Sequence, residues 1–350
     1  MSYDWSKILV GPEQPIRDAL ELINSESLRI VLVVDDEHHL LGVVTDGDIR
    51  RGLLRNLTIS CKISEVMNRQ PMTAKYGTSR KELVKFMSDE QLLAIPLMEG
   101  SKVVGLEPLQ SREEVSRHQN PVFLMAGGFG TRLQPLTDNC PKPLLKVGDK
   151  PILEILLDRF ISCGFVNFYI STHYLPEMIR EHFGDGTKWN VEIKYVHEES
   201  PLGTGGALGL LPDDISDLPV ILINGDLLTN VDFERVLDFH DKHDAVATMC
   251  VRDYEYQVPF GVIVGDGNKI ISMEEKPIQR FFVNAGIYIV NSEVRKAVNQ
   301  GTRIDMPTLL EQFIGESNKV MMFPIHEYWL DIGRIDDFRR AQTDILNLDF

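Results

Sequence analysis

Short apolar runs alternate with polar turns along the first 115 residues, and the pattern occurs twice. The segment LRIVLVVDDEHHLLGVVTDGD at 28–48 predicts a strand, an acidic turn, a second strand and the start of a helix. The segment LLAIPLMEGSKVVGLEPLQ at 92–110 repeats this pattern, and apolar residues at helical spacing precede each copy. Because each unit leaves one sheet face apolar, we expect the two copies to pack into an α+β module over residues 1–115.

A different pattern follows the polar segment SREEVSRHQN, and we place a linker at 116–120. Over 121–350, apolar strands alternate with helical segments, which predicts a Rossmann-like, three-layer α/β domain with a mostly parallel mixed sheet. The expected strands are 121–126, 166–171, 191–196, 219–224, 245–251 and 281–290. The segment GVIVGDGNKIISM predicts an inserted hairpin. Loops at the carboxyl ends of the parallel strands should carry the chemistry.

Composition narrows the class of protein. The formal net charge of −16 repels phosphate backbones, so we expect no nucleic-acid partner. No apolar run is long enough to span a bilayer and the first residues do not resemble a secretory signal, so we expect a cytoplasmic protein without membrane contact. The four cysteines form no C-x-x-C pair, which argues against a disulfide framework and a zinc ribbon.

The loop GGFGTRLQPLTDNCPKPL at 127–144 carries the strongest chemical signal. Glycines directly after a strand let backbone amides approach phosphate oxygens, and Arg132 and Lys142 add positive charge. No G-K-[ST] closes the loop, so it is not a Walker A motif. Leu133 stands where a dinucleotide fingerprint needs its third glycine, which argues against a dinucleotide-dependent oxidoreductase.

Two aspartates predict a metal site. Asp226 follows the apolar strand VILIN, and Asp331 lies between Leu330 and Ile332. A carboxylate at the end of a buried strand needs a partner, and two carboxylates with phosphate oxygens and water suit octahedral Mg²⁺. Either residue alone could instead be a helix cap or part of a buried ion pair.

Residues 120–345 resemble the sugar-nucleotide pyrophosphorylase family, the nucleotidyltransferases that make NDP-sugars. The resemblance rests on GGFGTRLQPLT, PKPL, LGTGGA at 202–207, NGD at 224–226, FGV at 260–262, EKP at 275–277, NAG at 284–286 and WLDIG at 329–333. It implies attack of a sugar 1-phosphate on the α-phosphorus of a nucleoside triphosphate, with release of pyrophosphate and no covalent enzyme intermediate.

The resemblance also assigns site residues. The catalytic residues are Arg132, Lys142, Asp226 and Asp331, of which the two aspartates would bind Mg²⁺. Nucleotide contacts are expected at Gly127, Gly128, Gly130, Thr131, Glu198, Gly203, Thr204 and Gly205. Sugar contacts are expected at Gly261, Glu275, Lys276, Asn284 and Gly286.

Glu198 bears on the choice of base. One carboxylate can accept hydrogen bonds from both N1 and N2 of guanine, which favours GTP, whereas uracil and thymine present a pattern better served by an amide. The LGTGGA segment is similar to that of the guanylyltransferase branch of the family. Together with the N-terminal module, the domain arrangement resembles that of glucosamine-1-phosphate guanylyltransferases. The candidate sugars are glucosamine, mannose and heptose 1-phosphate, and UTP, dTTP or CTP remain alternatives to GTP.

The N-terminal repeat resembles a CBS-domain pair, on the segment GVVTDGDI at 42–49. In CBS domains the threonine and aspartate of G-x-x-T-x-x-D contact an adenine nucleotide, which implies Thr45 and Asp48 here. We expect AMP, ADP or ATP as regulatory ligand unless these residues only cap the following helix. The second copy has Pro108 and Ser111 instead, so at most one nucleotide site is intact.

Three further features stay open. The chain could be a non-catalytic nucleotide sensor, although the set of arginine, lysine and two aspartates argues against that class. The amphipathic segment IDDFRRAQTDIL is expected to pack on the core or to serve a homo-oligomer interface.

His240 and His243 lie three residues apart on a helical stretch without a third metal ligand nearby. We therefore expect these histidines to lie on a solvated helix face and not to bind a metal.

Overall fold

The computed structural model describes residues 5–26, 29–90, 92–109, 117–314 and 319–348. The chain forms two compact units, Met1–Glu114 and Val115–Phe350. Residue 116 of the expected linker lies outside the described residues, and residues 118–120 already belong to strand β7 of the second unit. No helix among the described residues combines the length and the apolar character needed to cross a membrane.

The N-terminal unit confirms the repeat. Each copy is a three-stranded sheet in which a short parallel strand flanks an antiparallel hairpin, in the orders β1-β2-β3 and β4-β5-β6. Strands of the first copy are β1 Leu9–Val10, β2 Ile30–Val34 and β3 Leu40–Thr45; its helices are α1 Ile16–Glu26 and α2 Asp46–Leu54. The second copy has β4 Ala74–Lys75, α3 Arg80–Asp89, β5 Ala94–Glu99 and β6 Lys102–Pro108. Ala94, Val103 and Leu106 of the second copy join the first copy's core, so neither half buries its apolar face alone.

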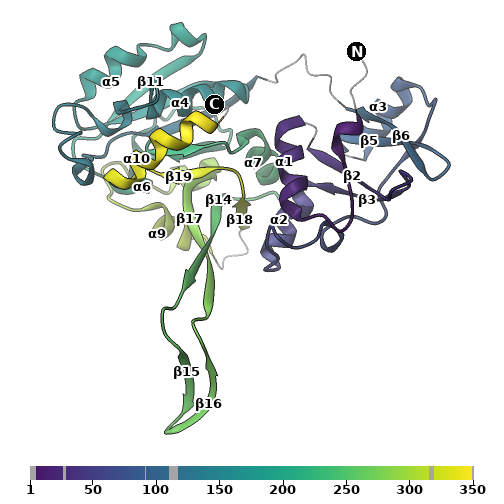
Figure 1. Ribbon diagram of the computed structural model, residues 1–350. Coiled ribbons are helices and arrows are strands. Elements are labelled where there is room, and N and C mark those ends of the chain that lie inside the picture. Colours follow the sequence, from purple (N-terminus) through teal and green to yellow (C-terminus); the bar gives the residue numbers. More distant parts are fainter. Residues whose placement is uncertain (1–4, 27–28, 91, 110–116, 315–318, 349–350) are drawn as a thin grey trace. The chain divides into compact units, whose positions relative to one another are not determined.

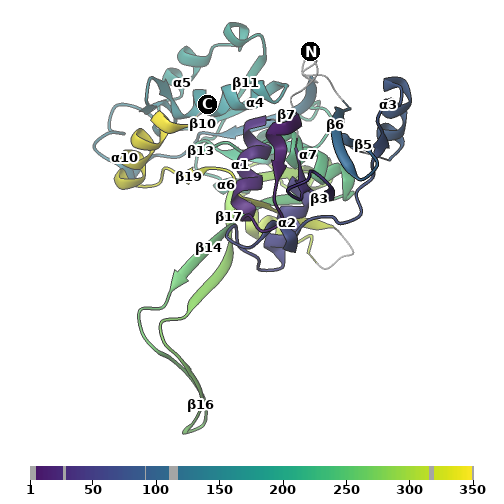
Figure 2. The same ribbon diagram turned by 45° about the vertical axis from the view of Figure 1, so that its right-hand side comes forward.

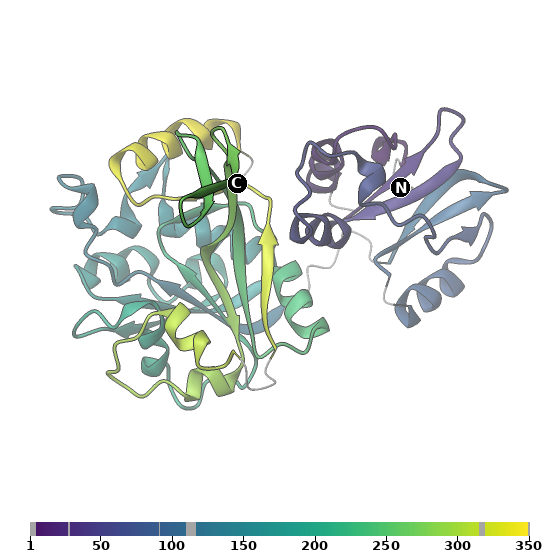
Figure 3. The ribbon, with the colours of Figure 1, turned by 90° about the horizontal axis from the view of Figure 1, so that it is seen from below.

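The C-terminal unit is built on a seven-stranded mixed sheet in the order β11-β10-β7-β12-β17-β14-β18 (Figure 1). β17 alone runs antiparallel to its neighbours, which confirms the mostly parallel sheet. The strands are β7 His118–Met125, β10 Phe165–Thr172, β11 Glu192–His197, β12 Val220–Asn224, β14 Ala247–Gln257, β17 Ile278–Val290 and β18 Val320–Ile325. All six expected strands are present, and β18 at the sheet edge was not expected (Figure 3).

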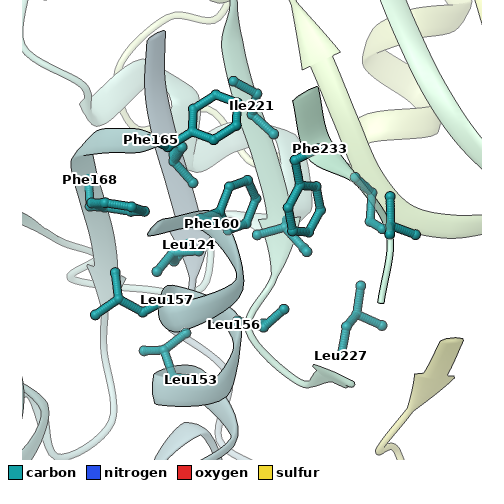
Figure 4. Packing of buried hydrophobic residues seen from close by; sticks show 14 of the residues in the cluster. Leu124, Leu153, Leu156, Leu157, Phe160, Phe165, Phe168, Ile221, Leu227 and Phe233 are labelled. Carbon is teal, nitrogen blue, oxygen red and sulfur yellow. The ribbon is translucent and has the colours of Figure 1, made fainter. Parts of the chain in front are cut away.

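Successive side chains along each strand point to opposite faces of the sheet, and the apolar ones form a core on each face. In β7, Val122 and Leu124 face one apolar cluster whereas Phe123 faces the other. The first cluster holds α4 (Ile152–Ser162) and α7 (Phe233–Lys242) against the sheet, with the ring of Phe160 stacked on that of Phe233 at 3.7 Å between centroids (Figure 4). The helices α8 (Ser292–Lys296) and α9 (Met306–Glu311) contribute to the second cluster. This three-layer arrangement agrees with the predicted fold class.

A smaller cluster lies beneath the loop at 127–144. It joins Leu133 of that loop to Leu228 of strand β13 (Leu227–Thr229) and to Leu330 of β19 (Trp329–Asp331). The terminal helix α10 (Ile335–Asp344) packs against the same cluster through Ala341, so the segment IDDFRRAQTDIL covers the core. These contacts fix the backbone beside Arg132 and Asp331, which flank two of the buried leucines.

The inserted hairpin is longer than the sequence predicted. β14 and β17 run on beyond the sheet as a two-stranded ribbon, which ends in β15 (Val262–Asp266) and β16 (Lys269–Glu274). We call residues 254–281 the arm. Figures 1 and 2 show the arm projecting away from the sheet in both views. The turn lies between Asp266 and Lys269, as expected, with Gly267 at φ 57°.

His240 corrects the expectation of a solvated helix face. Its side chain is 2% exposed, and its two ring nitrogens lie 2.9 Å from Thr248 Oγ1 and 2.9 Å from Asn291 Oδ1. Burial lowers the pKa of His240 below its usual 6.5, and the hydrogen bond to Asn291 only partly opposes this shift. The residue is therefore a structural group that ties α7 to the sheet.

Acidification should destabilise the fold through this histidine. The unfolded chain takes up the proton near pH 6.5 while the folded chain does not, so the stabilisation present above that pH is lost as pH falls through it. Urea midpoints of the wild type and of His240→Gln, measured between pH 5.5 and 7.5, should show a shallower acid decline in the variant. Equal declines would mean that His240 does not contribute to the pH dependence.

Candidate active site

A cavity of about 500 Å³ opens at the carboxyl ends of the parallel strands. Residues following β7 and β12 form its floor, and Ser171 of β10 lies beside them. Of the expected residues, Gly127, Gly128, Gly130, Thr131, Arg132, Lys142, Glu198, Gly203, Thr204, Asp226 and Asp331 line this cavity. The structure thus brings together all four expected catalytic residues and seven of the eight expected nucleotide contacts, the exception being Gly205, which is buried next to Thr204.

The loop after β7 is shaped by Gly130, which has a left-handed φ of 67°. A Cβ at this position would lie 2.9 Å from Thr137 Cγ2, closer than real Cβ atoms approach, and 3.0 Å from Lys142 Cβ, which is tighter than most such contacts. The Thr137 hydroxyl donates to the Gly130 carbonyl at 2.9 Å and closes the loop. Only glycine therefore allows this turn, which presents backbone amides to the cavity.

The two aspartates meet because β13 and β19 pair antiparallel, with Leu227 opposite Asp331. The backbone amide of Ile332 donates to the Asp226 carbonyl at 3.0 Å, so both carboxylates leave neighbouring points of one short ladder. Lys142 is 8% exposed, and its Nζ donates to Asp226 Oδ2. A Cβ on Gly333 would lie 3.6 Å from Asp331 Oδ1 and 3.7 Å from a guanidinium nitrogen of Arg132, which places both groups at this glycine.

The electrostatics of the pair fit a cation. Asp331 is accessible from the cavity, but the cavity walls remove much of the water around its carboxylate. This burial, and next the negative charge of Asp226, raise the pKa of Asp331, whereas the positive charges of Lys142 and Arg132 partly oppose the rise. Asp226 Oδ1 is buried and has no hydrogen-bond partner among the described residues. A carboxylate oxygen left unpaired is costly, and a hard divalent cation takes such oxygens as ligands. The donor set therefore fits a divalent metal ion.

A second glycine turn forms the opposite wall. A Cβ on Gly203, which has φ 79°, would lie 2.7 Å from Asp305 Oδ1, and the Thr204 amide donates to the same oxygen at 3.1 Å. Glu198 is 6% exposed; its Oε2 accepts from the Leu202 amide at 3.2 Å. Its Oε1 lies against Gly127, where any Cβ would collide with it. The turn thus holds the Glu198 carboxylate at the cavity wall.

The expected sugar residues lie outside the cavity in two groups. Gly286, at φ 70°, sits behind Asn224 of the cavity wall, and its amide donates to Asn284 Oδ1 at 2.9 Å. Gly261, Glu275 and Lys276 lie on the arm. A Cβ on Gly261 would be 2.9 Å from Glu275 Oε2, so this glycine and the carboxylate face each other across the ribbon. The structure does not bring the arm residues to their own chain's cavity.

Sequence reasoning missed three polar residues that line the cavity. Asn224 is the first residue of the quoted NGD motif, and its buried Oδ1 has no hydrogen-bond partner among the described residues. Ser171 accepts a hydrogen bond from the Ala126 amide at 3.1 Å and so fixes the start of the glycine loop. Asp305 precedes α9 and carried no sequence signal beyond that of a helix cap.

Thr45 and Asp48 form a capping box at the start of α2. Thr45 Oγ1 donates to Asp48 Oδ2 at 2.6 Å, and the Thr45 amide donates to the same oxygen at 2.9 Å. Arg51 donates to the other oxygen of Asp48 at 2.5 Å. These residues therefore cap α2 in the structure, and their contact with an adenine nucleotide stays a prediction. Pro108 ends β6, and Ser111 lies outside the described residues.

The charged cavity lies at the carboxyl ends of the parallel strands, where α/β proteins of this architecture bind their ligands. The chain belongs to the nucleotidyl transferase family, which matches residues 122–347, and CBS domains match residues 6–55 and 63–106. Mannose-1-phosphate guanylyltransferase of Mycobacterium tuberculosis is 31% identical over 242 residues, which are 66% of each protein. Mannose-1-phosphate guanylyltransferase catalytic subunit beta of Danio rerio is 31% identical over 228 residues, or 62% of each.

The chain thus spans less than two thirds of the length of these relatives. Among solved structures, HddC from Yersinia pseudotuberculosis superposes with a TM-score of 0.52 at 23% identity, over 65% of this chain and 99% of that one. This likeness supports the fold of the C-terminal unit.

Proposed function

We propose that the protein transfers a nucleoside monophosphate, GMP from GTP, to a sugar 1-phosphate and releases pyrophosphate. The observation that carries the proposal is the convergence of Arg132, Lys142, Asp226 and Asp331 on one cavity beside a glycine loop. Two cations and a carboxylate pair with an unpaired buried oxygen suit a reaction between two phosphorylated anions. The guanylyltransferase relatives support the same reaction class.

Asp226 and Asp331 would hold a magnesium ion, which offsets charge on the phosphates and polarises the phosphoryl group under attack. Arg132 would bind the departing pyrophosphate, and Lys142, held in place by Asp226, would approach the α-phosphate. Amides of Gly127, Gly128, Gly130 and Thr131 would surround the phosphate chain. Catalysis then consists of alignment and charge compensation, without a protein nucleophile.

Glu198 would select guanine, with the backbone of the second glycine turn packed near the base. Its carboxylate is fixed at the cavity wall by Leu202, so its remaining acceptor sites can meet N1 and N2 of guanine without reorganisation. Glucosamine, mannose and heptose remain the candidate sugars, and AMP, ADP or ATP the candidate ligands of the CBS pair. Thr45 and Asp48, which form a capping box in this structure, would contact the phosphate and the ribose of that nucleotide.

Glu198→Gln should lower the preference for GTP over UTP, expressed as a ratio of kcat/KM values, by about tenfold or more. Hydrogen bonds to a charged acceptor contribute roughly 1.5–3 kcal/mol, and the glutamine amide replaces one acceptor by a donor. Glu199→Gln is a matched control, because Glu199 is the adjacent glutamate and is exposed. An unchanged ratio in Glu198→Gln would refute the role in base selection.

The reverse reaction gives a direct test of the reaction class. With magnesium and pyrophosphate, a GDP-sugar should yield GTP and sugar 1-phosphate in equal amounts. Formation of GDP or free sugar instead would indicate hydrolysis and contradict the proposed transfer.

A further inference from the structure

The arm exposes an unusual amount of apolar side chain. Ten of the 22 large hydrophobic side chains that are exposed among the described residues lie between Tyr254 and Phe281. Phe260, Met273 and Ile271 are 73%, 70% and 63% exposed. Four of the ten are aromatic side chains, which offer about 150–250 Å² each, so with the six aliphatic and methionine side chains the two faces of the arm together leave on the order of 1,000 Å² of apolar surface in water. A stable interface buries about 800 Å² per partner.

The exposed residues are organised by strand alternation. Ile263 lies opposite Met273 in the ribbon, and Ile271 is two residues from Met273, so these three side chains share one face. Nearer the sheet, Tyr254 lies opposite Phe281. An isolated two-stranded hairpin is marginally stable in water, and apolar faces of this kind are retained where another surface covers them.

In this structure the arm does not cover the cavity of the chain to which it belongs. The β14–β17 register continues without a shift from Val251↔Asn284 to Gln257↔Ile278. The Val258 amide then donates to the Pro277 carbonyl at 3.0 Å, and Arg280 pairs with Glu255 at 2.5 Å. The ribbon therefore extends from the sheet as one ladder, and folding back onto its own cavity would break these pairs.

We propose that two copies of this chain exchange arms, so that the arm of each copy covers the partner's active site and completes its sugar subsite. The inference rests on the proposed function for the roles of Gly261, Glu275 and Lys276. In their own chain these residues lie outside the cavity, whereas the four expected catalytic residues line it without them. Reciprocal exchange closes at two copies, buries both arms, and brings a glutamate for sugar hydroxyls and a lysine for the sugar phosphate to each site.

The oligomeric state tests the exchange without any activity. Sedimentation should give twice the 39.7 kDa chain mass for the wild type. Ile271→Asp, and separately deletion of residues 258–277 with Gln257 joined to Ile278 through an Asn-Gly turn, should each give a monomer whose C-terminal unit still unfolds cooperatively. Ile314→Asp, at a side chain 62% exposed outside the arm, should stay dimeric. A monomeric wild type, or a dimer that survives both arm changes, would overturn the proposal.

Mixed dimers test which copy supplies the arm. A chain carrying Asp226→Asn keeps its arm but loses its own site, and a chain carrying Lys276→Gln keeps its site but loses the arm lysine. Each homodimer should be weakly active, whereas a doubly tagged heterodimer should regain about half the wild-type rate, because one intact site receives one intact arm. No gain in the heterodimer would show that each arm serves its own chain. An inactive wild type that is nevertheless an arm-dependent dimer would reject the proposed function and keep the interface.

Discussion

Asp226→Asn is expected to lower kcat for pyrophosphate release by about a hundredfold to a thousandfold, the range seen when one fixed charge-stabilising group is removed. The substitution keeps the volume and removes the charge that the structure leaves partly unpaired beside Asp331 and Lys142. Initial rates at increasing magnesium concentration should also show weaker apparent metal affinity, because an amide is a poorer ligand than a carboxylate.

Asp217→Asn provides the control for this substitution. Asp217 is an exposed aspartate whose ion pair with Lys296, at 2.9 Å, lies away from the cavity lining. It should leave kcat and the magnesium dependence unchanged. A kcat of Asp226→Asn within a few fold of the wild-type kcat would contradict the proposed metal-binding role of Asp226.

Phe160→Ala is expected to reduce the free energy of unfolding of the C-terminal unit by about 3–5 kcal/mol, a large share of the stability of an ordinary domain. The side chain is 0% exposed, stacks on Phe233 and packs edge-on against Phe165 at 5.5 Å between centroids, so its loss leaves a cavity between α4, α7 and the sheet. The urea midpoint should fall with little change in slope.

Leu218→Ala is the comparison for the core substitution, because Leu218 is 42% exposed and should cost less than about 1 kcal/mol. Because the chain has two compact units, the transition has to be followed with a probe attached to the C-terminal unit. A Phe160→Ala midpoint equal to that of Leu218→Ala would show that the stacked pair is not central to this core.

The sheet was predictable because its strands are short apolar runs between polar turns. β12 is VILIN followed by Gly-Asp, and such a continuous apolar run is typical of a parallel strand that is buried on both faces of the sheet. β18 escaped prediction because its run, VMMFPI, contains Pro324, which argues against a central strand. The structure resolves this by placing the strand at the sheet edge, where a missing amide donor is tolerated.

The cavity was predictable as far as motifs marked its residues. Arg132, Lys142 and Asp226 stand in local patterns, and their shared location follows from the parallel strands. Asp305 could not be found, since its contact with Thr204 joins positions 101 residues apart. The direction of the arm could not be predicted either. The alternation of apolar and polar residues predicts a hairpin, but whether its apolar faces contact the same chain or another depends on long-range packing.

The most direct measurement is pyrophosphate release by the purified chain with magnesium, each nucleoside triphosphate in turn and a panel of sugar 1-phosphates, with the nucleotide sugar identified by mass. We predict release with GTP and one of glucosamine, mannose or heptose 1-phosphate, a GDP-sugar in equal amount, and loss of both in Asp226→Asn. Preference for another triphosphate would contradict the role of Glu198 and keep the transfer. No release with any pair, with or without AMP or ATP, would contradict the proposed transfer and favour a non-catalytic nucleotide sensor.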